Sequence, residues 1–259
     1  MINLSTLQLE NMIGMYFWPF VRIAACLMVA PLFGARFVPA RLRIVLAAAV
    51  TLLVAPLLST PAVDAFSPGG LVITSQQLLI GVAFGFTLQL IFDAVGMSGQ
   101  LLANSMGLSF AFNVDPQRGA STPAVGQFYM LLLTMTFLGL GGHLALLQAL
   151  IDSFQRMPIG GVLVAPAALW SLVSFGATLF SGALLVALPG VTALLIVNLA
   201  FGVMSRAAPS LNLFAVGFPI SLLCGLVVMS AGLPTVQLGF IELIHEAFAA
   251  LAAFQGGAG

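Results

Sequence analysis

The residues that could carry out acid–base, nucleophilic or metal chemistry are few and lie far apart in the chain. The two histidines, His143 and His245, have no partner at the ligand spacing of a motif such as His-Glu-x-x-His. Cys26 and Cys224 each lie within an apolar run, which is typical of a small buried side chain rather than of a disulfide or a metal site. We therefore expect no bound metal, no cofactor and no enzymatic activity.

Several of these residues leave an alternative open. His143 is typical of a packing histidine hydrogen-bonded to a neighbouring carbonyl, with a proton relay as the alternative. The pattern Gly107-Leu108-Ser109 followed by His143 is compatible with an intramembrane serine protease, although Gly-x-Ser occurs often by chance. Arg22 and Asp93 are charges at or near membrane depth, where we expect an arginine–carboxylate pair facing protein, with substrate binding as the alternative.

The composition indicates an integral membrane protein. Of the 259 residues, 61% are hydrophobic and only 5% are charged, and the net charge is zero. A soluble domain has about 25% charged residues, and a nucleic-acid binder needs a basic patch. These values exclude an ordinary soluble enzyme, a disordered chain and a nucleic-acid-binding protein, and they indicate a surface covered by membrane lipid or by partner proteins.

The apolar runs are continuous, which predicts an all-α integral membrane protein with long kinked helices and helical hairpins, and excludes a transmembrane barrel. The run at 162–205 has no charge, so it either folds back at Pro189-Gly190 or forms one long kinked helix. Small residues at Gly81, Gly85 and Gly139 predict close helix–helix approach. The expected helical segments are 12–34, 44–63, 71–92, 95–114, 125–151, 162–205 and 213–238, followed by an amphipathic helix at 240–254.

Two features predict how the chain is placed among partners. Arg36, Arg41 and Arg43 form its densest positive cluster, which we expect to fix the orientation of the first helices with this loop in the cytoplasm. Prolines inside the apolar runs need neighbours that satisfy the freed carbonyl groups, which favours packing within a larger assembly. These prolines are Pro19, Pro31, Pro56, Pro189 and Pro219.

A loop with bulky apolar side chains is predicted after the fourth run. Asp115 precedes Pro116 and cannot easily remain helical, so the chain must leave the helix while it carries Met106, Phe110 and Phe112. Irregular backbone at membrane depth is tolerated only where it is buried in protein or lines a cavity. The residues alone leave two roles open for this loop, a packing element or a plug in a pore.

Three segments carry a resemblance to a known family. They are PLFGARFVPARLRIVLAAAVTLLVAP at 31–56, GQLLANSMGLSFAFNVDP at 99–116 and GGHLALLQALIDSFQRMPIGG at 141–161. In this order and spacing they resemble the R/T component family of the type III export gate, the flagellar FliR family. The resemblance covers most of the chain, and the three segments together are specific where no single one would be.

The resemblance implies a hetero-oligomeric export gate in the bacterial inner membrane, at the flagellar basal body. In that gate a chain of this family assembles with the P- and Q-type subunits FliP and FliQ into a channel for unfolded protein substrates. Residues 1–161 resemble a P-type component, and 162–259 resemble a Q-type hairpin with a terminal amphipathic helix. The alternatives are the T component of a virulence injectisome and, further away, a multi-pass small-molecule transporter.

The resemblance also implies roles for two segments. The loop at 106–122 corresponds to the plug of the family, beneath a methionine-rich constriction contributed by the P-type subunits, and its candidate gate residues are Met106, Phe110, Phe112, Asn113, Asp115 and Pro116. The switch protein FlhB wraps the cytoplasmic opening. The tip between the last two long apolar runs is a candidate contact for it, through Arg206, Pro209 and Asn212.

Overall fold

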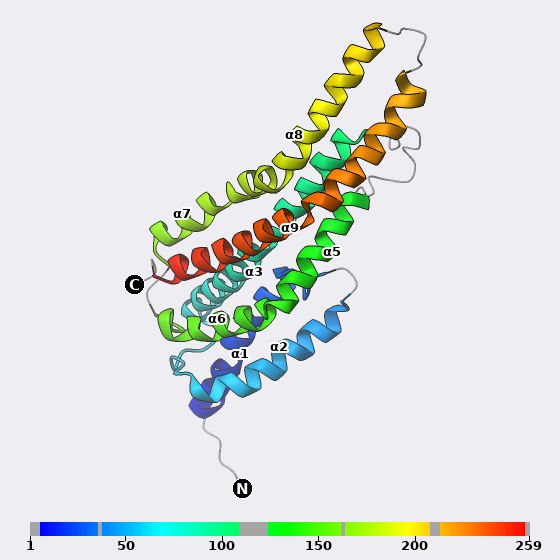
Figure 1. Ribbon diagram of the computed structural model, residues 1–259. Helices are drawn as coiled ribbons and strands as arrows, with labels where there is room; N and C mark the ends of the chain where they lie inside the picture. The colour runs from blue at the N-terminus through cyan, green and yellow to red at the C-terminus, as the bar shows by residue number, and fades with distance from the viewer. Residues whose placement is uncertain (1–5, 36–37, 109–123, 162–163, 208–212, 257–259) are drawn as a thin grey trace. The chain divides into compact units, whose positions relative to one another are not determined.

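The computed structural model describes residues 6–35, 38–108, 124–161, 164–207 and 213–256. The described residues form helices joined by short turns, with no strand among them (Figure 1). The helices are α1 (Thr6–Val29), α2 (Ala40–Val54) with the short 3₁₀ turn η1 (Ala55–Leu57), α3 (Pro68–Ser105), α5 (Ala124–Gly139), α6 (Gly142–Arg156), α7 (Pro166–Phe175), α8 (Thr178–Ala207) and α9 (Leu213–Gly256). The predicted all-α class is confirmed.

Four stretches of the described chain are long and apolar enough to cross a membrane. Helix α3 has 38 residues and α9 has 44. At about 1.5 Å per residue these helices reach roughly 57 and 66 Å, about twice the hydrocarbon core of a bilayer. The four stretches are Ala40–Leu57, Pro68–Ser105, Pro166–Ala207 and Gly217–Gly256.

Several helix ends differ from those predicted. Helix α3 continues past Asp93 to Ser105, where the sequence predicted two separate runs. Helix α8 continues through Pro189, so the chain does not fold back there. The predicted run at 162–205 is nevertheless not one helix, because a turn at Gly176 separates α7 from α8. The predicted run at 125–151 is instead broken into α5 and α6 at Gly141, which has a φ of +70°. A left-handed φ of this kind is strained for other residues and ends the regular helix.

The chain divides into two compact units. Unit 1 comprises Met1–Leu90, Gly141–Gly176 and His245–Gly259, and unit 2 comprises Ile91–Leu140 and Ala177–Ile244. The predicted division into 1–161 and 162–259 concerns likeness to two types of subunit rather than compactness, and it stays a prediction.

The core of unit 1 forms where α1 packs on α2 and on the first part of α3. A β-carbon added at Gly81 would lie 2.8 Å from the Cβ atom of Ala25, and one added at Gly85 would lie 2.7 Å from the carbonyl oxygen of Cys26. The predicted close approach at these two glycines is confirmed. Gly139, in contrast, has no atom within 4 Å of such a β-carbon, so the same prediction was wrong there.

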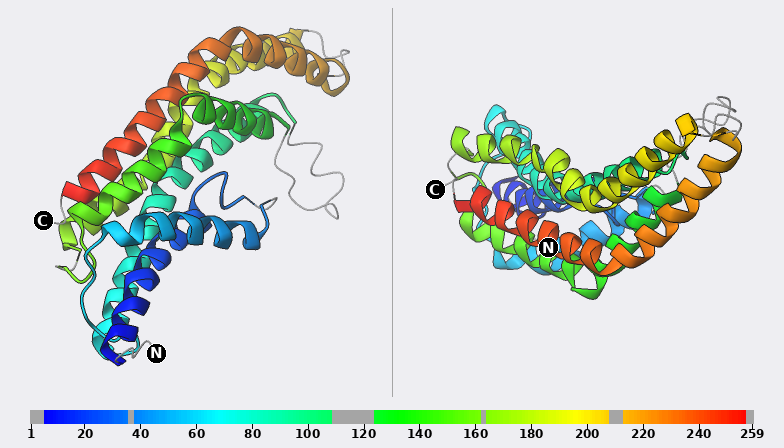
Figure 2. Two further views of the ribbon diagram at one scale, coloured as in Figure 1. Left: turned by 90° about the horizontal axis from the view of Figure 1, so that it is seen from below. Right: turned by 45° about the horizontal axis from the view of Figure 1, so that its top comes forward.

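Unit 2 contains α5, the last part of α3, all of α8 and most of α9. Within it, α8 and α9 run side by side (Figure 2). Aromatic side chains pack edge to face in its core, with ring centroids 5.7 Å apart for Phe92 and Phe137 and 6.0 Å apart for Tyr129 and Phe240.

The predicted amphipathic pattern at the end of the chain is confirmed, because Phe240, Leu243 and Ala247 are buried while Glu242 and Glu246 are exposed.

Candidate functional site at the end of α3

Helix α3 ends in a glycine-capped turn. Gly107 has a φ of +81°, and its N–H donates to the carbonyl of Asn104 while the N–H of Leu108 donates to the carbonyl of Ala103, both at 3.0 Å. These two bonds form a Schellman motif, which satisfies terminal carbonyls and stops a helix. The glycine of the Gly107-Leu108-Ser109 pattern is therefore explained by the helix cap, without a nucleophilic serine next to it. Ser109 itself lies outside the described residues.

The last residues of α3 are attached to both α8 and α9. The side chain of Met106 is 1% exposed, and a β-carbon added at Gly225 of α9 would lie 2.7 Å from its Cε atom. The carbonyl oxygen of Ser105 accepts a hydrogen bond from Nδ2 of Asn198 on α8, at 3.1 Å. Oδ1 of the same asparagine accepts a bond from the hydroxyl of Ser221 on α9, at 3.0 Å. One side-chain contact and one hydrogen-bonded relay thus hold this helix end.

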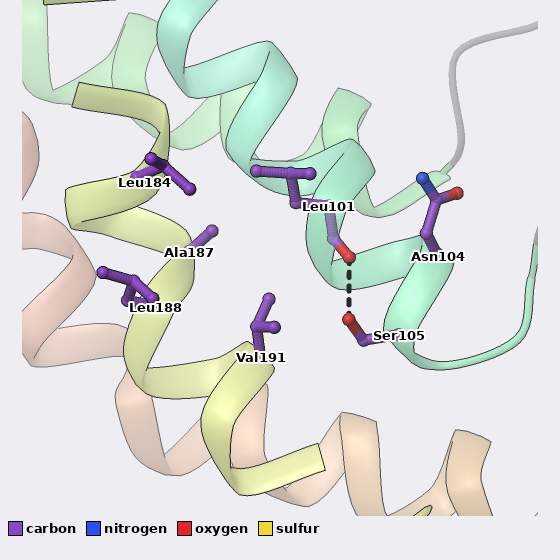
Figure 3. A pocket seen from close by; sticks show the side chains of 7 residues that line it. All are labelled: Leu101, Asn104, Ser105, Leu184, Ala187, Leu188 and Val191. Atoms are coloured by element: carbon purple, nitrogen blue, oxygen red, sulfur yellow. Dashed lines mark hydrogen bonds between the residues drawn. The ribbon is translucent and has the colours of Figure 1, made fainter. Parts of the chain in front are cut away.

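A cavity of about 350 Å³ lies next to this attachment, between α3 and α8 (Figure 3). Its polar side chains, Asn104 and Ser105, both belong to the last turn of α3, and the hydroxyl of Ser105 already donates to the carbonyl of Leu101 at 3.0 Å. The cavity therefore suits an apolar group better than chemistry on a polar substrate. Its lining residues are Leu101, Asn104, Ser105, Leu184, Ala187, Leu188 and Val191.

The structure describes one of the predicted plug residues, Met106, and places it directly after α3. The prediction that these residues form a plug stays a prediction. The other five, Phe110, Phe112, Asn113, Asp115 and Pro116, lie outside the described residues.

The predicted contact at the tip is described in part. Arg206 is exposed in the last turn of α8, where a positive charge interacts favourably with the helix dipole. Pro209 and Asn212 lie outside the described residues. The contact of this tip with a partner stays a prediction.

The two described arginines of the positive cluster lie at the start of α2 and differ in their surroundings. Arg41 is exposed, whereas Arg43 is half-buried and donates through Nη2 to the carbonyls of Ala35 and Val38, at 2.6 and 2.8 Å. Arg43 thus holds the turn that precedes its own helix, a role that the sequence did not predict. Arg36 lies outside the described residues, and the predicted effect of the cluster on orientation stays a prediction.

Arg22 is fully buried in unit 1, and its described acceptors are neutral. Its Nε atom donates to Oε1 of Gln77 at 2.8 Å, one terminal nitrogen donates to the hydroxyl of Ser153 at 3.0 Å, and the other donates to the carbonyl of Met157 at 2.8 Å. The guanidinium carbon also lies 4.2 Å from the ring centroid of Phe154. The predicted carboxylate partner is therefore replaced by neutral oxygens and a ring face, which disperse the charge over several dipoles.

The remaining candidates for chemistry do not form a site in the described part of the chain. The buried Nδ1 of His143 has no hydrogen-bond partner there, so the predicted bond to a carbonyl is not formed at that atom. His245 is exposed on α9. No three His, Cys, Asp or Glu side chains of the described residues gather closely enough to hold a metal ion.

Continuous apolar helices and an apolar site at a helix end define an all-α membrane protein with no assembled catalytic group in its described part. The chain matches the model of the bacterial export proteins, family 1, over residues 13–247. It is 38% identical over 252 residues to the flagellar biosynthetic protein FliR of Escherichia coli (strain K12), and equally to that of Pectobacterium carotovorum subsp. carotovorum, each time covering 97% of both chains. It is 29% identical over 214 residues to FliR of Bacillus subtilis (strain 168), covering 81% of this chain and 82% of the relative.

The chain therefore belongs to the bacterial export proteins, family 1, among the flagellar FliR proteins. It is a membrane component of the flagellar protein export apparatus, which contains further export components. This membership favours the flagellar machine over the injectisome and over a small-molecule transporter.

Proposed function

We propose that this chain forms, together with FliP and FliQ, the channel of the flagellar export gate for unfolded protein substrates, in the inner membrane at the basal body. The observation that carries the proposal is the match to FliR proteins over nearly the whole chain. Residues 1–161 take the place of a P-type subunit, and 162–259 take that of a Q-type hairpin. FlhB contacts the tip at Arg206, Pro209 and Asn212.

The exposed apolar surface of the last helices supports assembly with partners. In the most apolar windows of Pro166–Ala207 and of Gly217–Gly256, only 17% is buried within the chain. Exposed side chains such as Ile196, Val203 and Val227 therefore need lipid or protein to cover them. A closed assembly of similar helices would cover them while leaving a channel between subunits.

The loop at 106–122 acts as the plug of this channel. Phe110 and Phe112 are two residues apart, so in extended backbone their rings project to the same side. Two rings removed from water shield some hundreds of Å², worth roughly several kcal/mol at about 25 cal/mol per Å². Bulky apolar side chains in a narrow pore also exclude water and ions. Both effects keep the resting channel closed.

The test compares the double variant Phe110→Ala/Phe112→Ala with a control that removes two exposed phenylalanines outside the last helices, Phe66→Ala/Phe86→Ala. Conductance to ions at rest and the yield of assembled complex are measured on the same preparations. We expect the loop variant to assemble normally and to leak at least about tenfold more than the control, because a loss of about 1.4 kcal/mol already changes an equilibrium tenfold. If the loop variant assembles and conducts no more than the control, the plug is refuted. If the loop variant fails to assemble, the two phenylalanine rings contribute to core packing instead.

A further inference from the structure

We propose that Gly225 and Asn198 are positioning residues of the export gate, which fix the end of α3 and with it the point from which the 106–122 segment departs. The inference rests on the proposed plug and adds the part of the chain that sets its position. All four residues of the attachment belong to unit 2 and are described: Ser105 and Met106 at the end of α3, Asn198 on α8 and Gly225 on α9.

The contact at Gly225 depends on the absence of a side chain. A β-carbon there would lie 2.7 Å from Cε and 2.9 Å from Sδ of Met106 and closer still to its Cγ, which is nearer than real β-carbons approach. Because Cγ is close to the backbone, rotation of the thioether end alone does not remove this overlap. Met106 is 1% exposed and Gly225 is buried, so the long side chain fills a hollow on α9 that only glycine leaves open. An unbranched thioether adapts well to such a hollow. An alanine at 225 would push Met106 out of its place.

The relay through Asn198 fixes the backbone of the same helix end. The last carbonyls of a helix have no intrahelical partner, and the Schellman motif at Gly107 uses those of Asn104 and Ala103. The carbonyl of Ser105 is satisfied instead by the amide of Asn198, which Ser221 orients through its hydroxyl. Asn198 thus joins α3 to α8 and, through Ser221, to α9. The glycine cap ends α3, and two other helices hold that end in place, α8 through the backbone and α9 through a side chain.

Two glycines serve as matched controls because a β-carbon added to either would meet no atom within 4 Å. They are Gly232, seven residues after Gly225 on α9, and Gly202, four residues after Asn198 on α8. Gly225→Ala and Gly232→Ala make the same chemical change on the same helix. They differ in what the new methyl group meets.

The first experiment measures resting conductance and assembly yield of the complete export-gate complex. We expect Gly225→Ala to assemble and to leak at least about fivefold more than Gly232→Ala. Met106→Ala should leak as well, because the hollow at Gly225 is left unfilled. The double variant Gly225→Ala/Met106→Ala should leak less than the sum of the two single variants, because the two changes compensate in volume. Asn198→Leu should leak more than Gly202→Ala.

The second experiment tests the contact without reference to conductance. In a Cys224→Ala background, Met106→Cys/Gly225→Cys should form a disulfide on mild oxidation of the assembled complex, since a β-carbon at position 225 would touch the side chain at 106. Met106→Cys/Gly232→Cys should not, because position 232 lies about two helical turns further along α9.

The outcomes separate the inference from the proposed function. A missing cross-link at 106 and 225, failure of Gly225→Ala to assemble, or a Gly225→Ala complex as tight as Gly232→Ala would overturn the positioning role. In those cases a leak in the Phe110→Ala/Phe112→Ala variant would still support the proposed plug function of the loop. If the cross-link forms while neither the loop variant nor Gly225→Ala leaks, the plug itself is refuted.

Discussion

Arg22 is a buried charge held by acceptors from two other helices and a following turn, and its replacement by methionine should weaken the fold. The change keeps an apolar chain of similar length but leaves the carbonyl of Met157 and the amide oxygen of Gln77 without their donor. Each buried acceptor left unpaired costs about 1–3 kcal/mol, so we expect Arg22→Met to lower the Tm of the purified complex by about 5 °C or more.

The matched control is Arg156→Met, which removes an exposed arginine from the same unit. It should change the Tm little, because an exposed charge contributes little to stability. Arg22→Met/Gln77→Leu removes both partners of one bond and should recover part of the lost stability. Equal Tm values for the two single arginine variants would show that the buried network does not stabilise unit 1.

The sequence identified Arg22 as a residue that needs protein around it, but it predicted the wrong partner. Gln77 lies 55 residues further along the chain, Ser153 lies 131 and Met157 lies 135. No local spacing connects such positions, and two of the acceptors are an ordinary serine and a backbone carbonyl. A carboxylate was predicted because it is the usual partner of arginine, whereas the packing of α1 with α3 and α6 provides neutral groups instead.

The break between α5 and α6 offers a prediction at the scale of elements. Gly139 and Gly141 both have open space where a β-carbon would be, but only Gly141 has a positive φ. We expect Gly139→Ala to stabilise by about 0.5–1 kcal/mol, because alanine is the better helix residue, and Gly141→Ala to destabilise by about 1–2 kcal/mol, because the left-handed conformation is strained for alanine. Thermal unfolding of the two variant complexes measures both. Shifts in the same direction would contradict a conformational role for Gly141.

Helix positions could be predicted from the apolar runs, whereas several helix ends could not. Proline is a poor helix residue in water, yet α8 continues through Pro189 and α9 through Pro219 and Pro234, because an apolar surrounding gives the backbone no better alternative than the helix. The break at Gly141 lies inside an uninterrupted apolar run, where hydropathy carries no signal. Of the candidate site, the sequence identified Met106 but neither Gly225 nor Asn198, since a small residue and an amide on distant helices become meaningful only through their contacts.

For the whole molecule, the large apolar surface predicts dependence on partners. We expect the chain expressed alone to aggregate or to be degraded, because side chains such as Leu199, Val203 and Val227 remain uncovered. Co-expression with FliP and FliQ should raise its yield several-fold and give a single species. Size-exclusion chromatography in detergent, with the chain quantified in membranes before extraction, measures both effects. A stable, monodisperse lone chain would show that lipid or detergent is sufficient.

The buried network of Arg22 also has a consequence in time. The acceptor at Met157 is made 135 residues after the arginine, and at roughly 5–20 residues per second the ribosome needs about 7–27 s to reach it. Throughout that interval the guanidinium of Arg22, in the apolar part of α1 at Ile13–Val29, lacks its final partners and is costly to bury in hydrocarbon. We expect nascent chains that stop before Met157 to keep this segment at the membrane surface, where proteases reach it. Burial of α1 with all the described acceptors of Arg22 is thus completed only after α6 and Met157 have been made.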